Sequence, residues 1–180
     1  MPMIDACIPE GALTPEAEAK LFEELTNILI RLEGLDPANE RARAASWIFV
    51  HRPRVYVAGA AAATPRYRFI PVVPEGQYDD ARRAAVVREV TEAVSRAEGR
   101  PLDEVGTRVW VFPTELPDGH WGSRGQLWRL PDIAARLAGE DGRRAAQDRL
   151  SERRRQAAVA LLGAVSAASF DGATDAADAP

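Results

Sequence analysis

The 180-residue sequence has little of several features that would point to whole classes of protein. Cys7 is the only cysteine, so a single chain forms neither an internal disulfide nor a thiolate metal cluster. No segment approaches the roughly 18 to 20 consecutive apolar residues of a membrane-spanning helix, and no apolar run follows a basic segment at the amino terminus. We therefore expect a protein of the reducing cytoplasm that has no membrane partner.

Charge of one sign is also not concentrated in any segment. The formal net charge is -4, and arginine is interspersed with aspartate and glutamate, so we expect no nucleic-acid partner. Phosphate-binding loops, dinucleotide-binding glycine motifs and a Ser/His/Asp order are absent from the sequence. His51 and His120 lack metal-ligand spacing with any carboxylate or thiolate. We expect neither a cofactor nor a metal site.

The sequence contains one unit twice. The residues Ile-Pro-Glu-Gly at 8–11 return as Val-Pro-Glu-Gly at 73–76, and Trp-Ile-Phe at 47–49 returns as Trp-Val-Phe at 110–112. The offsets are 65 and 63 residues. Two echoes in the same order and at nearly equal offsets predict a duplicated unit with a small change in length.

Each unit is predicted to contain a strand, a helix and a second strand. In the first unit, residues 3–8 and 46–50 form the strands. Thr14 caps the helix between them, which has Pro15 in its first turn and ends near Gly34. One face of this helix is apolar and is made by Ala17, Leu21, Leu25, Ile28, Leu29 and Leu32.

The second unit repeats this order, with strands at 67–73 and 107–112 and a helix that Asp79 caps and Gly99 ends. Two βαβ units that share one sheet give an α/β (α+β) fold, in which a four-stranded sheet carries both helices on one face. The opposite face of that sheet would be apolar and uncovered. This predicts association through it.

The composition divides the chain into a domain and an extension. Residues 1–130 are predicted to form the duplicated domain, with repeat one at 2–58 and repeat two at 66–130. Residues 131–170 form a helical extension rich in arginine and alanine, and residues 171–180 form a disordered tail of small and acidic residues. We interpret the extension as a solvated appendage; the alternative is a partner-binding or oligomer-capping element.

Three features together resemble the tautomerase superfamily: Pro2 after the initiator methionine, the duplicated βαβ unit, and the run Pro-Asp-Gly-His-Trp-Gly-Ser-Arg-Gly at 117–125. The resemblance covers the chain from Pro2 to about residue 130. It implies a homotrimer of two-repeat chains, with sites near the proline and a small carbonyl or enol compound as substrate. Tyr67 stands where the second copy would need its proline, so one site per chain is expected.

Pro2 is the candidate catalytic base. An amine accepts a proton only when it is neutral, and an ordinary α-amino group has a pKa of about 8. Burial and nearby cations disfavour the ammonium form, so a proline amine freed by removal of Met1 can act as acid and base near neutral pH. The competing interpretation is that Pro2 merely starts an edge strand.

The resemblance assigns further residues to the site. Trp110 stands where the cis-3-chloroacrylic acid dehalogenases also have tryptophan, but Phe112 replaces their catalytic tyrosine. Trp121 matches the aromatic residue beside the proline in 4-oxalocrotonate tautomerase, and Glu40 matches the catalytic aspartate of malonate semialdehyde decarboxylase. Trp121 could equally be a core residue, and Glu40 could be a solvated acid.

The arginines that grip a substrate carboxylate in such enzymes are missing from their usual positions. Those positions are occupied by Ala12, Pro74, Gln77 and Trp110. Arg52, Arg54 and Arg124 are the candidate replacements, because guanidinium matches a carboxylate in shape and charge, although each could be only a surface residue. We therefore expect an apolar, weakly cationic pocket that handles a neutral substrate as well as the corresponding carboxylate.

The leading hypothesis is a cofactor-independent tautomerase in which Pro2 moves a proton between carbon and oxygen. One alternative is a hydrolytic dehalogenase or a decarboxylase of a small three-carbon acid, in which Glu40 or another acid positions water. Another is a catalytically idle trimeric binding protein that has kept the fold.

Overall fold

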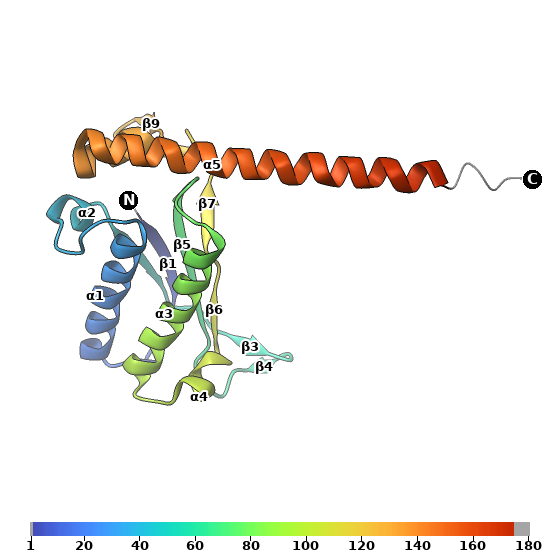
Figure 1. The fold of residues 1–180 in the computed structure, drawn as a ribbon. Helices are drawn as coiled ribbons and strands as arrows, with labels where there is room; N and C mark the ends of the chain where they lie inside the picture. The colour runs from blue at the N-terminus through green and yellow to red at the C-terminus, as the bar shows by residue number, and fades with distance from the viewer. Residues whose placement is uncertain (1, 175–180) are drawn as a thin grey trace, which may run out of the picture.

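A mixed sheet of five strands forms the centre of the fold (Figure 1). The computed structural model describes residues 2–174, and side chains as far as residue 165. Along the sheet the strand order is β2-β1-β5-β6, and β7 also pairs with β5. The strands are β1 (Met3–Cys7), β2 (Trp47–His51), β5 (Tyr67–Pro74), β6 (Val109–Val111) and β7 (Thr114–Leu116). The predicted four-stranded sheet therefore gains β7, which follows β6 after Pro113 along the same edge of β5.

The strand register confirms the duplication. β1 is parallel to β2, β5 is parallel to β6, and β1 is antiparallel to β5. Met3 pairs with Trp47 in the first unit, and Arg68 pairs with Trp110 in the second. This equivalence places Tyr67 at the position of Pro2.

The two long helices begin and end where their caps predict. Helix α1 (Pro15–Leu32) starts after Thr14, whose Oγ1 accepts the Ala17 N–H at 3.2 Å. Gly34 follows its end with φ of +82°, which a residue with a Cβ rarely adopts. Helix α3 (Asp80–Glu98) starts after Asp79, whose carboxylate accepts the Arg82 N–H at 2.7 Å. Both helices lie over the same face of the sheet (Figure 1).

Side chains alternate along the strands between a buried face of the sheet and an open one. Ile4 and Ala6 of β1 and Phe69 of β5 pack into the core beneath α1 and α3. The opposite face carries large exposed aromatic residues: Trp47, Phe49, Trp110 and Phe112, which are 63%, 45%, 66% and 47% exposed. The expected apolar, uncovered face is therefore present in the single chain.

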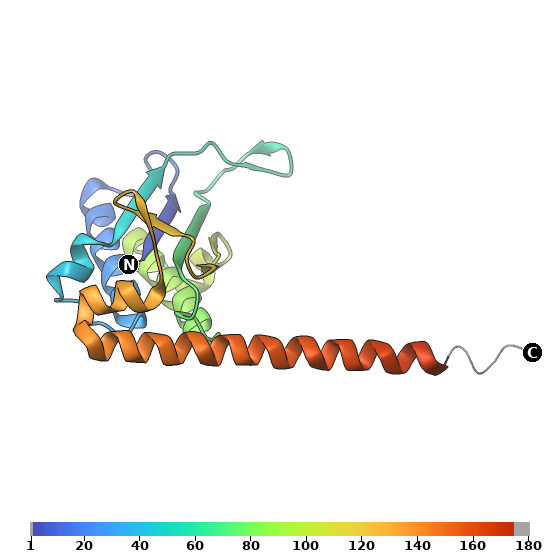
Figure 2. The ribbon, with the colours of Figure 1, turned by 90° about the horizontal axis from the view of Figure 1, so that it is seen from above.

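Short elements surround this framework. Two are five-residue helices, α2 (Glu40–Ala44) and α4 (Leu102–Gly106). Two are hairpins, made by β3 (Tyr56–Val57) with β4 (Ala60–Ala61) and by β8 (Trp121–Ser123) with β9 (Gln126–Trp128). The first hairpin projects from the body, and the second lies close to α5 (Figures 1 and 2).

The C-terminal extension is helix α5 (Leu130–Thr174), which crosses the end of the sheet and projects far beyond it (Figures 1 and 2). Its backbone departs from helical angles at Ala138 and Gly139, where Gly139 has φ of +70°. The helix continues through residues 171–174, and residues 175–180 of the predicted tail lie outside the described part. None of the helices in residues 2–174 combines the length and hydropathy that crossing a membrane requires.

A buried ion pair ties α3 to β6. Glu98 accepts hydrogen bonds from Arg108 at 2.6 and 2.8 Å and from the Tyr67 hydroxyl at 2.6 Å. The side chains of Arg108 and Glu98 are only 7% and 6% exposed. The cluster includes Tyr67, the residue equivalent to Pro2. The second unit therefore has a structural cluster at the position that Pro2 occupies in the first.

Glu98→Gln should lower the free energy of unfolding by about 3 to 5 kcal/mol, because Arg108 would keep a buried charge without its partner. Urea denaturation at neutral pH measures this loss. Glu24→Gln is the matched control, since it removes an exposed ion pair with Arg96 and should cost at most about 1 kcal/mol. Equal losses in the two variants would contradict the assignment.

The pH dependence of stability gives a second readout of the same variant. Burial opposes ionisation of Glu98, but hydrogen bonds from Arg108 and Tyr67 outweigh it and lower the pKa of the carboxyl group from its ordinary value of 4.5. A carboxylate with a lowered pKa stabilises the fold above its ordinary pKa, and this contribution disappears as the pH falls through the lowered value. Wild type should therefore lose stability more steeply than Glu98→Gln in that acidic range.

Candidate functional site

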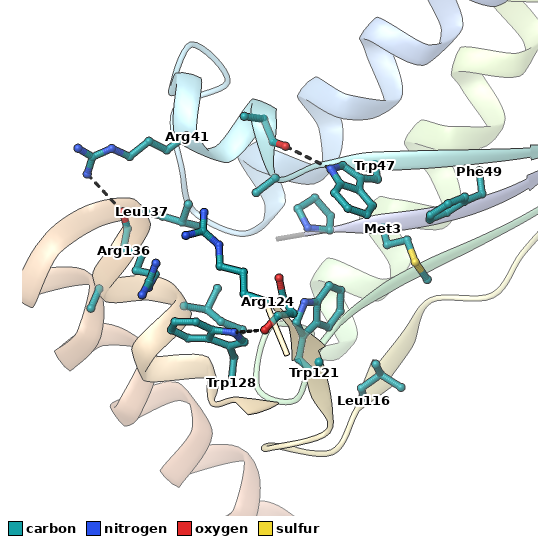
Figure 3. A pocket seen from close by; sticks show the side chains of 17 residues that line it. Met3, Arg41, Trp47, Phe49, Leu116, Trp121, Arg124, Trp128, Arg136 and Leu137 are labelled. Atoms are coloured by element: carbon teal, nitrogen blue, oxygen red, sulfur yellow. Dashed lines mark hydrogen bonds between the residues drawn. The ribbon is translucent and has the colours of Figure 1, made fainter. Parts of the chain in front are cut away.

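A cavity of about 1100 Å³ opens beside the start of β1 and β2 (Figure 3). Pro2 and Met3 line it at the start of β1, Trp47 and Phe49 from β2, and Leu116 from β7. The remaining walls come from α2, the β8–β9 hairpin and the first turns of α5. Both units of the duplication and the C-terminal helix thus meet at this cavity.

Strand pairing sets the position of Pro2. Its side chain is buried, and its carbonyl oxygen accepts the Trp47 N–H at 3.3 Å as the parallel β1–β2 pairing begins. The proline ring therefore lies at the start of a central strand and lines the cavity.

The β8–β9 hairpin brings Trp121 and Arg124 to the cavity. Trp121 pairs with Trp128, and the two-residue turn between the strands has positive φ at Arg124 (+54°) and Gly125 (+73°). Positive φ at both central residues matches the twist of a tight hairpin. The Trp128 indole N–H donates to the Ser123 carbonyl oxygen at 3.0 Å and closes the hairpin on itself.

The cavity is cationic. Arg41 of α2, Arg124 of the hairpin and Arg136 of α5 line it, and none of the lining residues in the described part of the chain is acidic. Arg136 lies with its Cζ 4.1 Å from the ring centroid of Trp128. Within residues 2–165 none of these three arginines forms an ion pair, whereas most arginines elsewhere do. Besides Arg124, elements missed by the sequence pattern therefore add two further arginines to the residues that line the cavity.

Comparison with known proteins gives the family. No family model matches the sequence. Two curated relatives, both 2-hydroxymuconate tautomerases of Pseudomonas putida, are 42% identical over 53 residues, which make up 29% of this chain and 76% of each relative. The chain belongs to the tautomerase superfamily.

Solved structures share the fold of this tautomerase-superfamily chain at low sequence identity. A fused 4-OT described as a symmetric trimer has a TM-score of 0.57 and 21% identity, over 76% of this chain and 98% of its own. Pt0534 inactivated by 2-oxo-3-pentynoate has a TM-score of 0.57 and 19% identity, over 70% and 94%. Macrophage migration inhibitory factor of Toxoplasma gondii has a TM-score of 0.55 and 13% identity, over 70% and 99%.

Three of the residues assigned from the superfamily resemblance line the cavity: Pro2, Trp121 and Arg124. Glu40 does not line it. That side chain is exposed at the start of α2, one residue before Arg41, which does. Arg54 is also exposed and lies outside the cavity-lining residues.

Other assigned residues have different surroundings. Arg52 binds both carboxylate oxygens of Glu18, at 2.6 and 2.7 Å. Gln77 is buried and accepts a hydrogen bond from Arg149 of α5 at 3.3 Å. Trp110 and Phe112 lie on the open face of the sheet rather than in the cavity of their own chain.

Arg41, Trp128 and Arg136 are cavity residues that the sequence pattern missed. Arg41 lies in a helix too short to give an apolar period, and Arg136 lies in an extension that was interpreted as solvated. The one available signal was the apolar spacing of Leu130, Ile133 and Ala134 after the hairpin, which marks a helix that packs on the domain.

Asp118 fixes the beginning of α5. Its side chain is 3% exposed, and it accepts the Leu130 N–H at 2.9 Å and a hydrogen bond from Arg129 at 2.8 Å. Burial raises the pKa of this carboxyl group, but these two donors and Arg154 outweigh burial and lower it overall. An ionised carboxylate at a helix N-terminus also complements the helix dipole. The first turns of α5 are thus held as a wall of the cavity.

Asp118→Ala should release this wall. We expect the free energy of unfolding to fall by about 1 to 3 kcal/mol, because the N–H of Leu130 loses a charged acceptor, and amide hydrogen exchange to increase in residues 130–137. Asp148→Ala, at an exposed position later in α5, is the control and should change neither. Unchanged exchange in residues 130–137 of Asp118→Ala would show that other contacts hold the helix.

Proposed function

We propose that the chain is a cofactor-independent tautomerase in which the Pro2 amine, exposed by removal of Met1, moves a proton within a small carbonyl or enol substrate. The observation that carries this proposal is the burial of Pro2 beside a cavity lined by Arg41, Arg124 and Arg136, none of which forms an ion pair within residues 2–165. Burial and neighbouring cations both favour a neutral amine. A neutral amine is the form that accepts a proton.

The proton balance of the reaction needs only this amine. The Pro2 nitrogen takes the proton of the enol hydroxyl, and the resulting ammonium group returns a proton to the substrate carbon, which yields the ketone and restores the neutral amine. Negative charge develops on the substrate oxygen between these steps. Arg124 lines the same cavity and is suited to stabilise it, since a guanidinium group donates charge-assisted hydrogen bonds to an anionic oxygen.

The arginines favour an anionic substrate over a neutral one. A carboxylate bound by guanidinium forms charge-assisted hydrogen bonds, and the cavity contains such donors without acids to compete for them. The hydrolytic alternative needs an acid to position water, whereas Glu40 is exposed and outside the cavity. This argument favours proton transfer over hydrolytic dehalogenation or decarboxylation of a three-carbon acid.

Pro2→Ala should lower kcat/KM for ketonisation of phenylenolpyruvate by about 100-fold or more, the usual contribution of a positioned acid-base group. Absorbance of the enol measures the reaction. Pro15→Ala, at the exposed start of α1, is the matched control and should leave the rate unchanged.

Two further measurements decide the role of the amine. Intact mass should show that Met1 has been removed from the active protein. The rate should fall as the pH is lowered through the pKa of the amine, because the ammonium form cannot accept a proton. Full activity with Met1 retained would contradict the proposed mechanism.

We also propose that the chain assembles as a homotrimer through the open face of the sheet. The four exposed aromatic residues there make an apolar patch that a monomer rarely leaves uncovered. Fused 4-OT structures of the same fold are described as trimers. Trp110 and Phe112 would then lie at the interface between chains.

Trp110→Asp should disrupt the trimer, because the charge would be buried in the subunit interface. Sedimentation velocity should show a trimer for wild type and a smaller species for this variant. Val87→Glu, on the exposed surface of α3 in the other layer, should remain trimeric. A monomeric wild type would overturn the proposed assembly.

A further inference from the structure

Helix α5 becomes apolar where it leaves the domain. Each residue from 154 to 165 is exposed, and this part of the helix projects past the edge of the sheet formed by β6 and β7 (Figures 1 and 2). Ten of residues 139–155 are charged, whereas none of residues 157–165 is. A helix that projects into solvent is expected to show the reverse pattern, because an apolar helix is normally buried.

The apolar surface of the projection is not confined to one stripe. Val159, Leu161 and Leu162 are 65%, 66% and 67% exposed. With about 3.6 residues per turn, Val159 and Leu161 point about 160° apart around the helix axis, and Leu162 lies between them. So broad an apolar surface is typical of a helix that another chain covers.

The face that docks α5 on its own domain continues into the projection. Ala146 and Leu150 are buried against Leu130, and the backbone of Leu150 passes close to Gly76. Leu161 follows Leu150 by eleven residues, about three helical turns, and therefore lies on the same face. Leu161 is exposed because the helix has by then passed the edge of the sheet. A surface that packs on one copy of the domain thus extends toward the place of a second copy.

The position and length of the projection favour a neighbouring chain of the trimer as its occupant. Trp110 of β6 and Phe112 after it are exposed on the open face, at the edge past which α5 projects. A chain that covers these two aromatic residues extends past that edge. Residues 154–174 of α5 span about 30 Å, which is about the diameter of a small domain. The projection is therefore long enough to cross such a neighbour.

We propose that residues 157–165 of α5 pack against the neighbouring chain and strengthen the trimer. This inference rests on the assembly through the open face that is part of the proposed function. The first turns of the same helix line the cavity beside Pro2. Helix α5 thereby connects the candidate site of one chain to the body of the next.

Amide hydrogen exchange on the full chain tests the packing. In the wild-type trimer, residues 157–165 should exchange at least about tenfold more slowly than in Trp110→Asp, because a helix without tertiary packing is only marginally stable. Residues 15–32 of α1, which pack in the core of their own chain, are the internal control and should differ by less than about twofold. Fast exchange of residues 157–165 in the wild-type trimer, or equal protection in a dissociated Trp110→Asp, would overturn the proposal.

A double variant, Leu161→Glu with Leu162→Glu, tests the contribution to assembly. It should raise the concentration at which the trimer dissociates by about tenfold or more, because two charges would enter an apolar contact. Glutamate is a good helix former, so the circular dichroism of the helix should persist. Gln147→Glu, at an exposed position where α5 lies over its own domain, should dissociate like wild type. Sedimentation velocity over a dilution series measures all three proteins.

Photo-crosslinking identifies the occupant. With p-benzoylphenylalanine in place of Val159, illumination of the full chain should give covalent dimers, and the Trp110→Asp background should abolish them. Cross-links confined to one chain would assign the surface to its own domain and overturn the proposal. Protection of residues 157–165 that appears only with added phosphatidylcholine vesicles would assign it to a membrane surface and also overturn the proposal.

Failure of this proposal is distinguishable from failure of the proposed function. Equal dissociation of the wild-type trimer and the double variant would keep assembly through the sheet and overturn the role of α5. A trimer that resists Trp110→Asp but dissociates in the double variant would do the reverse. The dependence of ketonisation on Pro2 is measured separately from both.

Discussion

The antiparallel pairing of β1 with β5 is the interaction on which the architecture depends, because it joins the two units edge to edge. Each unit alone has a helix over two parallel strands, and the pairing puts both helices on one face with a shared core. It also carries the chain beyond the second unit back toward the start of β1. The β8–β9 hairpin and α5 therefore reach Pro2 from the opposite half of the duplication.

The two units differ at the position of Pro2. At the residue equivalent to Pro2, the second unit has Tyr67, whose hydroxyl donates to the Glu98 carboxylate bound by Arg108. Burial and the Glu98 carboxylate both raise the pKa of this phenol. The phenol therefore stays protonated at neutral pH and does not serve as a base. The same backbone position therefore has the proposed catalytic proline in one copy and a structural hydrogen bond in the other.

Local signals predicted the framework and long-range packing decided the site. Thr14, Asp79, Gly34 and Gly99 mark helix ends through hydrogen bonds within a few residues, so the sequence pattern located α1 and α3 closely. The docking of α5 depends instead on distant contacts. Gly76, with φ of +90°, leaves room for the backbone of Leu150, since a Cβ there would lie 3.1 Å from its Cα. Such a contact has no periodicity to reveal it.

The cationic cavity and the docking of α5 are energetically linked. Arg41, Arg124 and Arg136 come from three separate elements, and like charges in one cavity repel unless an anion lies among them. That repulsion opposes docking of α5 on the domain. The hydrogen bond from Leu130 to Asp118 and the stacking of Arg136 over Trp128 favour it. Under the proposed function, a ligand bound among these arginines would stabilise the docked helix by mass action, and by the same linkage loosening α5 would weaken binding of the ligand.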